Sequence, residues 1–359
     1  MSEDVYRELQ KHLDEMPIGF PATESGVELR ILRYLFTPEE ARIVTKLSWE
    51  YEPVEKIHGR FSEGEISIDK LEEKLEGMAR KGAIHYKLEG GKKLYANAPL
   101  AIGMYEYQVK RLTKEFQEAM DQYIQEAFAL EFLRTGILQL RVIPIEKSLT
   151  PQSYVATYDD LRKIIENMEG PFCVAECICR KAAEMKGNPC SVTSERENCL
   201  TFGSAAQFYI DNGLGRSISK EEFIEILRRN EEAGLVLQPG NAQRPEFICS
   251  CCGCCCGILS NLKMFPNPAE LIHSNYHAQV NPELCTGCET CLERCQIDAL
   301  KIVDGVSTVD LKRCIGRGNC VPTCPSEAVT LQRKEEEFVP PKTLEDLYRK
   351  IKTIKDQMT

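Results

Sequence analysis

Several features of a secreted, membrane-bound or nucleotide-binding protein are missing from this chain. No apolar run approaches the roughly 18 residues that a membrane-spanning helix needs. The N-terminal MSEDVYRELQ has neither the basic segment nor the apolar stretch of a signal peptide. GxGxxG and Walker-A loops are both absent, so any flavin or nicotinamide chemistry is expected on another subunit. These absences predict a cytoplasmic protein with no membrane contact.

Positive charge is also scarce, since 45 Lys and Arg face 55 Asp and Glu and the net charge is -10. An acidic chain is repelled by phosphates, so binding to nucleic acid or to an anionic membrane is disfavoured. The 359 residues, 43% of them apolar, suffice for two or three hydrophobic cores. We therefore expect a globular protein with several domains.

Cysteine is absent before Cys173 and then abundant, because all 18 cysteines crowd into three short stretches. Their spacings are typical of metal ligands and not of disulfides in a small secreted domain. We predict metal-thiolate chemistry in a reducing compartment. So many thiolates would oxidise readily in air, which favours an anaerobic host.

The cysteine-free region shows helical and hairpin patterns. A helix is predicted from the cap Ser67 to Gly82, followed by two strands joined at Gly90-Gly91. This arrangement resembles the winged-helix domain of bacterial transcription regulators, which would make residues 67–81 a recognition helix. Apolar spacing then predicts a long helix from Met104 to Phe128 and a strand over residues 138–145.

The predicted fold class is α+β with several domains. We expect a winged-helix-like domain with flanking helices (1–147), a helical cysteine-rich iron-sulphur domain (148–278), a ferredoxin-like 4Fe-4S domain (279–333) and an amphipathic C-terminal helix (334–359). The first boundary is placed around residues 146–152. The last helix is expected to pack on the protein itself, with a partner-docking role as the alternative.

The run Cys285-x-x-Cys288-x-x-Cys291-x-x-x-Cys295 is the strongest signal in the chain. It matches the spacing by which bacterial ferredoxins bind [4Fe-4S] clusters, in which the fourth cysteine serves the other cluster. A shift of 29 residues reveals an internal duplication that superposes Cys285, Gly287, Cys291, Cys295 and Ala299 on Cys314, Gly316, Cys320, Cys324 and Ala328.

This region resembles the two-cluster bacterial-type ferredoxin domain. The resemblance implies two sets of ligands, Cys285, Cys288, Cys291 and Cys324 for cluster I, and Cys295, Cys314 and Cys320 for cluster II. Arg317 stands where the fourth ligand of cluster II is expected, and a guanidinium has no lone pair to donate. The second site could therefore bind a [3Fe-4S] cluster, bind a [4Fe-4S] cluster with an outside ligand, or stay empty. Zinc is the alternative for both sites and is disfavoured by the four-cysteine run.

The central cysteines form two groups without a known template. The first comprises Cys173, Cys177, Cys179, Cys190 and Cys199, and the second Cys249, Cys251, Cys252, Cys254, Cys255 and Cys256. One cluster is predicted on Cys177, Cys179, Cys190 and Cys199, with Cys173 as a buried structural residue. If the second group is extended, Cys249, Cys251 and Cys255 face one way and Cys252, Cys254 and Cys256 the other.

We expect that second group to bind at least one further cluster, either alone or completed by a cysteine of the first group, with iron-sulphur favoured over zinc. Arg180, beside the CxC, is predicted either to neutralise a cluster or to form a surface ion pair with Glu184.

The predicted function is single-electron transfer by an electron carrier or an electron-transfer subunit that serves a redox partner protein. Two alternatives remain, an iron-sulphur sensor that binds DNA and a reductase with a cluster-based active site. The recognition-like helix carries Asp69, Glu72, Glu73 and Glu76, and these carboxylates disfavour DNA. We expect the N-terminal domain to dock a partner or another copy of the chain.

Overall fold

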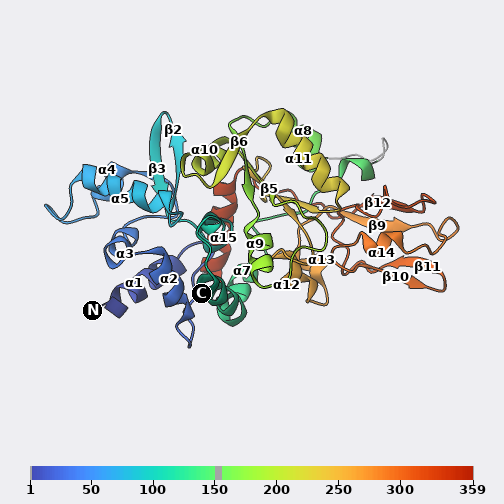
Figure 1. Cartoon of the computed structure of the whole chain (residues 1–359), viewed down its shortest axis with the longest axis horizontal. Coiled ribbons are helices and arrows are strands. Elements are labelled where there is room, and N and C mark those ends of the chain that lie inside the picture. Colours follow the sequence, from blue (N-terminus) through green and yellow to red (C-terminus); the bar gives the residue numbers. More distant parts are fainter. Residues whose placement is uncertain (1, 150–155, 359) are drawn as a thin grey trace. The chain divides into compact units, whose positions relative to one another are not determined.

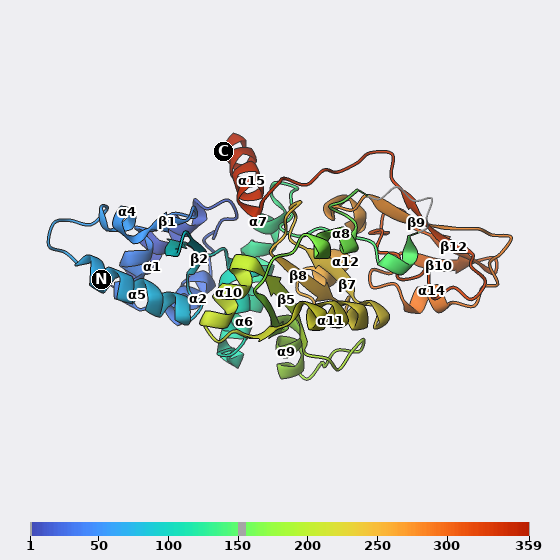
Figure 2. The same cartoon turned by 90° about the horizontal axis from the view of Figure 1, so that it is seen from above.

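The computed structural model describes residues 2–149 and 156–358 (Figures 1 and 2). It divides into two compact units. The first comprises residues 1–136, 204–216 and 348–359, and the second residues 137–203 and 217–347. Within the described residues, no helix combines the length and apolar character needed to cross a membrane. The four predicted domains stay predictions, and the boundary around 146–152 falls partly on residues 150–155, outside the described residues.

The first unit combines helices with one small sheet. Its α-helices are α1 (Ser2–Asp14), α2 (Val27–Leu35), α3 (Pro38–Val44), α4 (Val54–His58), α5 (Ile68–Arg80), α6 (Lys114–Tyr123), α7 (Ala129–Leu133), most of α10 (Gly203–Asp211) and most of α15 (Leu344–Gln357). Its strands are β1 (Glu52–Pro53), β2 (His85–Glu89) and β3 (Lys92–Ala96), in the antiparallel order β1-β3-β2.

Helix α5 and the hairpin after it confirm the sequence pattern. Ser67 caps the helix by accepting a hydrogen bond from the Lys70 N–H, at 3.4 Å. The turn at Gly90-Gly91 has positive φ at both residues, as a tight hairpin requires. Ile68, in the first turn of the helix, is 39% exposed, whereas Leu71 and Leu75 are buried.

Two predicted elements are wrong. The long helix from Met104 is interrupted, because Thr113 adopts an extended conformation and caps a new helix, α6, by accepting from the Phe116 N–H. Residues 138–145 do not form a strand of the sheet. They make two isolated bridges, Leu140 to Gly240 and Arg141 to His273, although their apolar side chains are buried.

The central region is built on a sheet, so the prediction of a helical cysteine-rich domain is wrong. Its five strands are β4 (Phe172–Glu176), β5 (Glu197–Phe202), β6 (Gly215–Ile218), β7 (Val236–Pro239) and β8 (Phe247–Cys251), in the order β6-β4-β5-β8-β7. Short apolar runs with β-branched and aromatic residues favour strands, and cysteines interrupt those runs here. The metal-ligand pattern concealed the strand pattern.

The sheet is flanked by the helices α8 (Leu161–Glu166), α9 (Ile178–Met185) and α11 (Lys220–Glu232). Of these, α8 and α11 contribute residues to its core. Ser219 caps α11 by accepting from the Glu222 N–H. The core contains Ile143, Leu161, Ile164, Met168, Val174, Leu200, Phe202, Ile218, Phe223, Ile226, Leu227, Leu237 and Ile248.

The ferredoxin-like region contains two small antiparallel pairs. Strand β9 (Tyr276–Val280) pairs with β12 (Val329–Arg333), and β10 (Leu300–Val303) pairs with β11 (Val306–Val309). Short helices α12 (Leu259–Lys263) and α13 (Pro268–Leu271) precede these pairs, and α14 (Thr290–Glu293) lies between β9 and β10 in the chain. Figures 1 and 2 show α14 beside the four strands.

The duplication is visible in the backbone. Residues 29 positions apart share positive φ angles, in the pairs Gly287 and Gly316 (66° and 65°), Glu289 and Gly318 (64° and 81°), and Asp298 and Glu327 (53° and 53°). Gly316 must be glycine, because a Cβ there would lie 2.0 Å from the Tyr276 carbonyl oxygen. The repeat therefore preserves turn geometry as well as cysteine positions.

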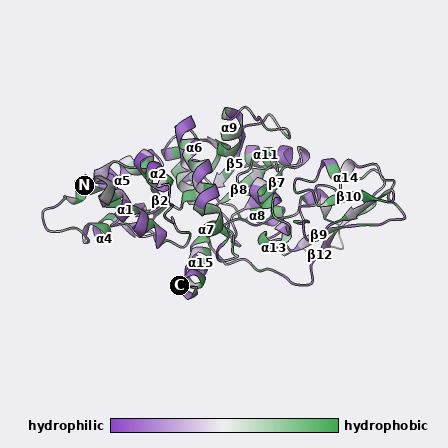
Figure 3. Cartoon of the chain, turned by 90° about the horizontal axis from the view of Figure 1, so that it is seen from below, coloured by the Kyte–Doolittle hydropathy of each residue, from purple (hydrophilic) through white to green (hydrophobic). Residues whose placement is uncertain are grey.

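The C-terminal helix α15 (Leu344–Gln357) carries hydrophilic and hydrophobic residues along its length (Figure 3). Leu347 and Ile351 are buried. In the first unit, Lys355 donates hydrogen bonds to the Asp14 carbonyl at 2.8 Å and the Glu131 carboxylate at 2.6 Å. These contacts favour the prediction that the tail packs on the protein itself.

Candidate iron-sulphur and thiolate metal sites

The first ferredoxin set is Cys285, Cys288, Cys291 and Cys324. Two of its thiols meet at Ser307, whose N–H donates to Cys285 Sγ and whose Oγ lies 3.3 Å from Cys291 Sγ. The hydroxyl of Ser326 lies 3.6 Å from Cys324 Sγ. Hydrogen bonds of this kind stabilise thiolate ligands and tune the potential of a cluster. All four sulphur donors expected from the spacing are present.

The second ferredoxin set, Cys295, Cys314 and Cys320, lines a cavity of about 40 Å³. Ala278 donates its N–H to Cys314 Sγ at 3.3 Å, and Ala299 donates to Cys295 Sγ at 3.2 Å. Burial, with Cys314 and Cys295 as neighbours, raises the pKa of Cys320. The bond from Ala278 to Cys314 is the counterpart of the bond from Ser307 to Cys285. Both donors and both acceptors lie 29 positions apart, so the repeat is exact in register.

Arg317 has a structural role that replaces ligation. It is 5% exposed, and its guanidinium donates to the Leu235 carbonyl at 3.0 and 3.2 Å and to the Ile143 carbonyl at 3.2 Å. Glu231 lies 3.9 Å away and balances part of the charge. These contacts attach the loop that carries Cys314 and Cys320 to the central sheet. The second set therefore offers three thiols and an anchored cation.

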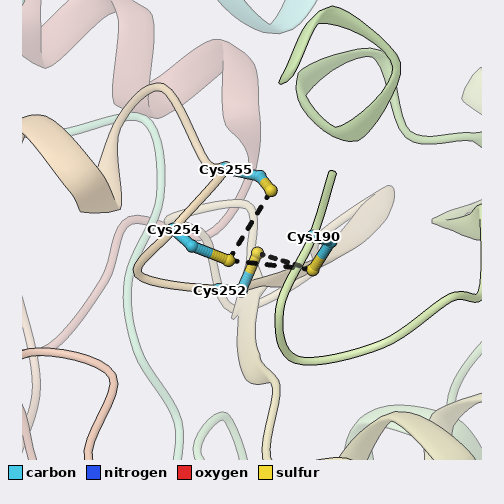
Figure 4. Close-up of side chains that lie close together, drawn as sticks. All are labelled: Cys190, Cys252, Cys254 and Cys255. Atoms are coloured by element: carbon cyan, nitrogen blue, oxygen red, sulfur yellow. Dashed lines mark hydrogen bonds between the residues drawn. The ribbon is translucent and has the colours of Figure 1, made fainter. Parts of the chain in front are cut away.

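Four central thiols lie close together and are called here the compact set (Figure 4). The set is Cys190, Cys252, Cys254 and Cys255, whose Sγ atoms all lie within 4.8 Å of one another. Burial acts to raise the pKa of Cys190, but the N–H groups of Thr193 and Val192 and the Arg180 side chain outweigh it and lower the pKa to about 6. The thiolate of Cys190 is thereby stabilised.

A second central group, the strand set, is Cys177, Cys179, Cys251 and Cys256. Its thiols contact one another in sequence. A hydrogen bond with Cys179 raises the pKa of Cys177, and hydrogen bonds with Cys249 and Cys256 lower that of Cys251 to about 6. Cys179 also hydrogen-bonds to Cys256. Cys177 occupies the residue directly before α9 and Cys251 ends β8, so the end of a strand and the start of a helix converge here.

The structure divides the central cysteines differently from the sequence prediction. Cys190 lies with the second cysteine group instead of with Cys177, Cys179 and Cys199. Cys199 pairs with Cys249 across β5 and β8. The predicted alternation over residues 249–256 also fails, because β8 ends at Cys251 and the chain then turns. Cys255 thus joins Cys252 and Cys254.

Arg180 is buried between these two sets. It is 1% exposed and donates to the Asn198 side chain and the Ser250 carbonyl, both at 3.0 Å. Cys177 and Cys252, one thiol from each set, both raise its pKa against the effect of burial. The predicted surface pair with Glu184 is wrong, since Glu184 pairs with Arg196. A permanent cation therefore faces both groups of thiols.

Cys173 is fully buried in β4, as predicted for a structural residue. A feature that the sequence did not indicate links the cysteine-rich loop to the ferredoxin-like region. The Gly253 N–H donates to the Gln296 side-chain oxygen at 3.0 Å. A Cβ at Gly253 would lie 2.2 Å from the Gln296 carbonyl oxygen. The loop of the compact set is thus packed against the residue that follows Cys295.

Comparison with known proteins agrees with this geometry. Residues 277–335 match the family described as a 4Fe-4S dicluster domain. An uncharacterized ferredoxin of Methanocaldococcus jannaschii is 38% identical over 55 residues, covering 15% of this chain and 36% of the relative. One component of an ion-translocating oxidoreductase complex of Methanosarcina acetivorans is 31% identical over 48 residues, covering 13% of this chain and 18% of the relative. No solved structure matches the chain.

The chain therefore spans about a third and less than a fifth of the length of these relatives. The C-terminal region is a ferredoxin-like 4Fe-4S domain, and its cysteines fit that cofactor because backbone N–H groups already donate to their sulphur atoms. The dicluster match and the central cysteines outside the compact set together support several [4Fe-4S] clusters. Such clusters serve iron-sulphur electron transfer.

Proposed function

We propose that this protein is an electron carrier or an electron-transfer subunit that passes single electrons to and from a redox partner protein. The observation that carries the proposal is the complete first ferredoxin set within a region that matches a 4Fe-4S dicluster domain. A [4Fe-4S] cluster on Cys285, Cys288, Cys291 and Cys324 would supply the one-electron couple. The chain's own Ser307 and Ser326 would tune that couple through their bonds to sulphur.

The second ferredoxin set supports an internal route for electrons. It lies beside the cysteine-rich loop, because Gln296 accepts from Gly253 directly after Cys295. We assign the strand set, Cys177, Cys179, Cys251 and Cys256, as ligands of a further cluster. Arg180 would balance the negative charge of that cluster. The ferredoxin-like and central regions would then exchange electrons inside one compact unit.

The first unit fits a partner-docking role better than DNA binding. The order of α4, α5, β2 and β3 after β1 supports the winged-helix resemblance. However, three lysines that could face DNA are paired with carboxylates. Lys74 in α5 pairs with Glu39, Lys81 directly after α5 pairs with Glu40, and Lys93 in the hairpin pairs with Glu76. Paired cations contribute less to phosphate binding. A gel-shift series that showed steep salt dependence would instead favour the DNA-binding alternative.

The full-length protein, purified without oxygen, provides the test. Iron and acid-labile sulphide should be present in cluster amounts, and dithionite should produce the EPR signal of reduced [4Fe-4S] clusters. Protein-film voltammetry should then show reversible one-electron waves. Protein that contains no sulphide, or that shows no reversible wave, would contradict electron transfer by clusters.

A further inference from the structure

The compact set differs from the other thiol groups in how closely its sulphur atoms approach. The Sγ atoms of Cys190 and Cys252 lie 3.6 Å apart, those of Cys190 and Cys254 3.7 Å, and those of Cys254 and Cys255 3.6 Å. Among the described residues, this is the one group of three or more Cys, His, Asp or Glu ligand atoms that all lie within 4.8 Å. The two ferredoxin sets do not reach this mutual spacing.

Such spacing matches one metal ion. Thiolates at about 2.3 Å from a tetrahedral ion lie about 3.8 Å from each other. The four thiolates of a cubane bind four different iron atoms and therefore stand further apart. The ferredoxin sets serve as an internal comparison, because their region matches a cluster-binding family and their sulphur atoms are not drawn together in this way.

We propose that Cys190, Cys252, Cys254 and Cys255 bind a single tetrahedrally coordinated metal ion, either zinc or iron, and not a cubane. This site is separate from the electron-transfer clusters and does not depend on the proposed function. An S₄ donor set is the preferred environment of Zn²⁺ and also suits a mononuclear iron centre.

The position of Cys190 explains what the ion would do. Residues 186–196 connect α9 to β5, and none of them is buried. Such a segment cannot be fixed by a hydrophobic core, whereas an ion bound to Cys190 would attach it to the Cys252–Cys255 turn (Figure 4). The ion would thus be a structural cross-link between two segments far apart in the sequence.

The test measures iron, zinc and acid-labile sulphide in the full-length, anaerobically purified chain and in the double variant Cys254→Ser/Cys255→Ser. The variant should lose about one metal ion per chain and no sulphide. If that ion is zinc, the site is a structural zinc site; if it is iron, the visible absorption of a mononuclear iron-thiolate should disappear. Loss of about four iron atoms with four sulphides would overturn the proposal. Unchanged metal content would overturn it too.

Two further measurements keep the test decisive if the double variant does not fold. Cys190→Ser changes a residue in an exposed connection and should lose the same single ion, with faster trypsin cleavage after Lys186 and Arg196. Cys173→Ala is the matched control and should keep all metals, because that thiol belongs to neither set. If the ion is zinc, X-ray absorption of the unmodified protein at the zinc edge should show four sulphur neighbours at about 2.3 Å. Zinc with nitrogen or oxygen neighbours, in a chain whose iron does not exceed its acid-labile sulphide, would contradict the proposal.

Discussion

The ferredoxin-like region and the central sheet both gather cysteines, yet they arrange them differently. In the ferredoxin-like region the thiols are distributed on turns repeated every 29 residues, and backbone N–H groups from β9 and β11 donate to equivalent cysteines, Cys314 and Cys285. In the central region the thiols contact one another directly around a buried arginine, Arg180. The separated thiols of the ferredoxin-like region can surround a cluster, whereas the closely spaced thiols of the compact set suit one ion. Cysteine density alone therefore does not identify the cofactor.

Removal of one ferredoxin ligand should cost the protein a whole cluster. Cys324→Ser removes the thiol that comes from the distant half of the repeat, so the first site should lose its cluster. We expect a loss of about four iron atoms and four sulphides per chain, measured chemically and by EPR after reduction. Cys173→Ala removes a thiol that belongs to none of the four sets. It should leave the iron content and the sulphide content unchanged. Full iron and sulphide content in Cys324→Ser would refute the ligand assignment.

The sequence predicts the ferredoxin-like region better than the central region. The repeated turns of the ferredoxin-like region could be predicted, because ligand spacing in a duplicated run reflects local turns, and Gly287 and Gly316 adopt positive φ at those turns. The grouping of the central thiols was not predictable, since it depends on where β8 ends and on a long connection that returns Cys190 to residues 252–255. The strands themselves were missed because cysteines occupied positions that apolar residues usually fill. The sequence predicts that Arg317 is not a ligand, but its contacts with Leu235 and Ile143 depend on tertiary structure.

Arg180 should contribute strongly to the stability of the central region. Arg180→Met should lower the free energy of unfolding by about 4 kcal/mol, because it leaves a buried network of Asn198, Asn230 and Ser250 incompletely paired and removes the cation beside the thiols. Urea unfolding under anaerobic conditions measures the change. Arg228→Met alters an exposed arginine paired on its own helix with Glu225, and should change stability by less than about 0.5 kcal/mol. Equal effects of the two variants would show that Arg180 carries no buried interaction.

Arg317 should contribute to stability by joining the ferredoxin-like region to the central region. Arg317→Met should cost about 3 kcal/mol in the same measurement, because the Leu235 and Ile143 carbonyls lose a charged donor and Glu231 loses its neighbour. Iron bound at the first ferredoxin set should remain. A stability equal to that of Arg228→Met would mean that the anchor is dispensable and that Arg317 matters only as the missing ligand.

Gln296 makes one of the direct contacts between the two regions, and its loss should cost less than the loss of either buried arginine. Gln296→Ala removes the oxygen that accepts from the Gly253 N–H and should cost about 1 kcal/mol, the usual value of one neutral hydrogen bond. Gln332→Ala is a matched control, because Gln332 is exposed and its side chain donates to the hydroxyl of Thr330 in the same strand. A larger loss, accompanied by loss of metal from the compact set, would show that the Gln296 contact positions the Cys252–Cys255 turn. The two regions would then assemble their metal sites together instead of independently.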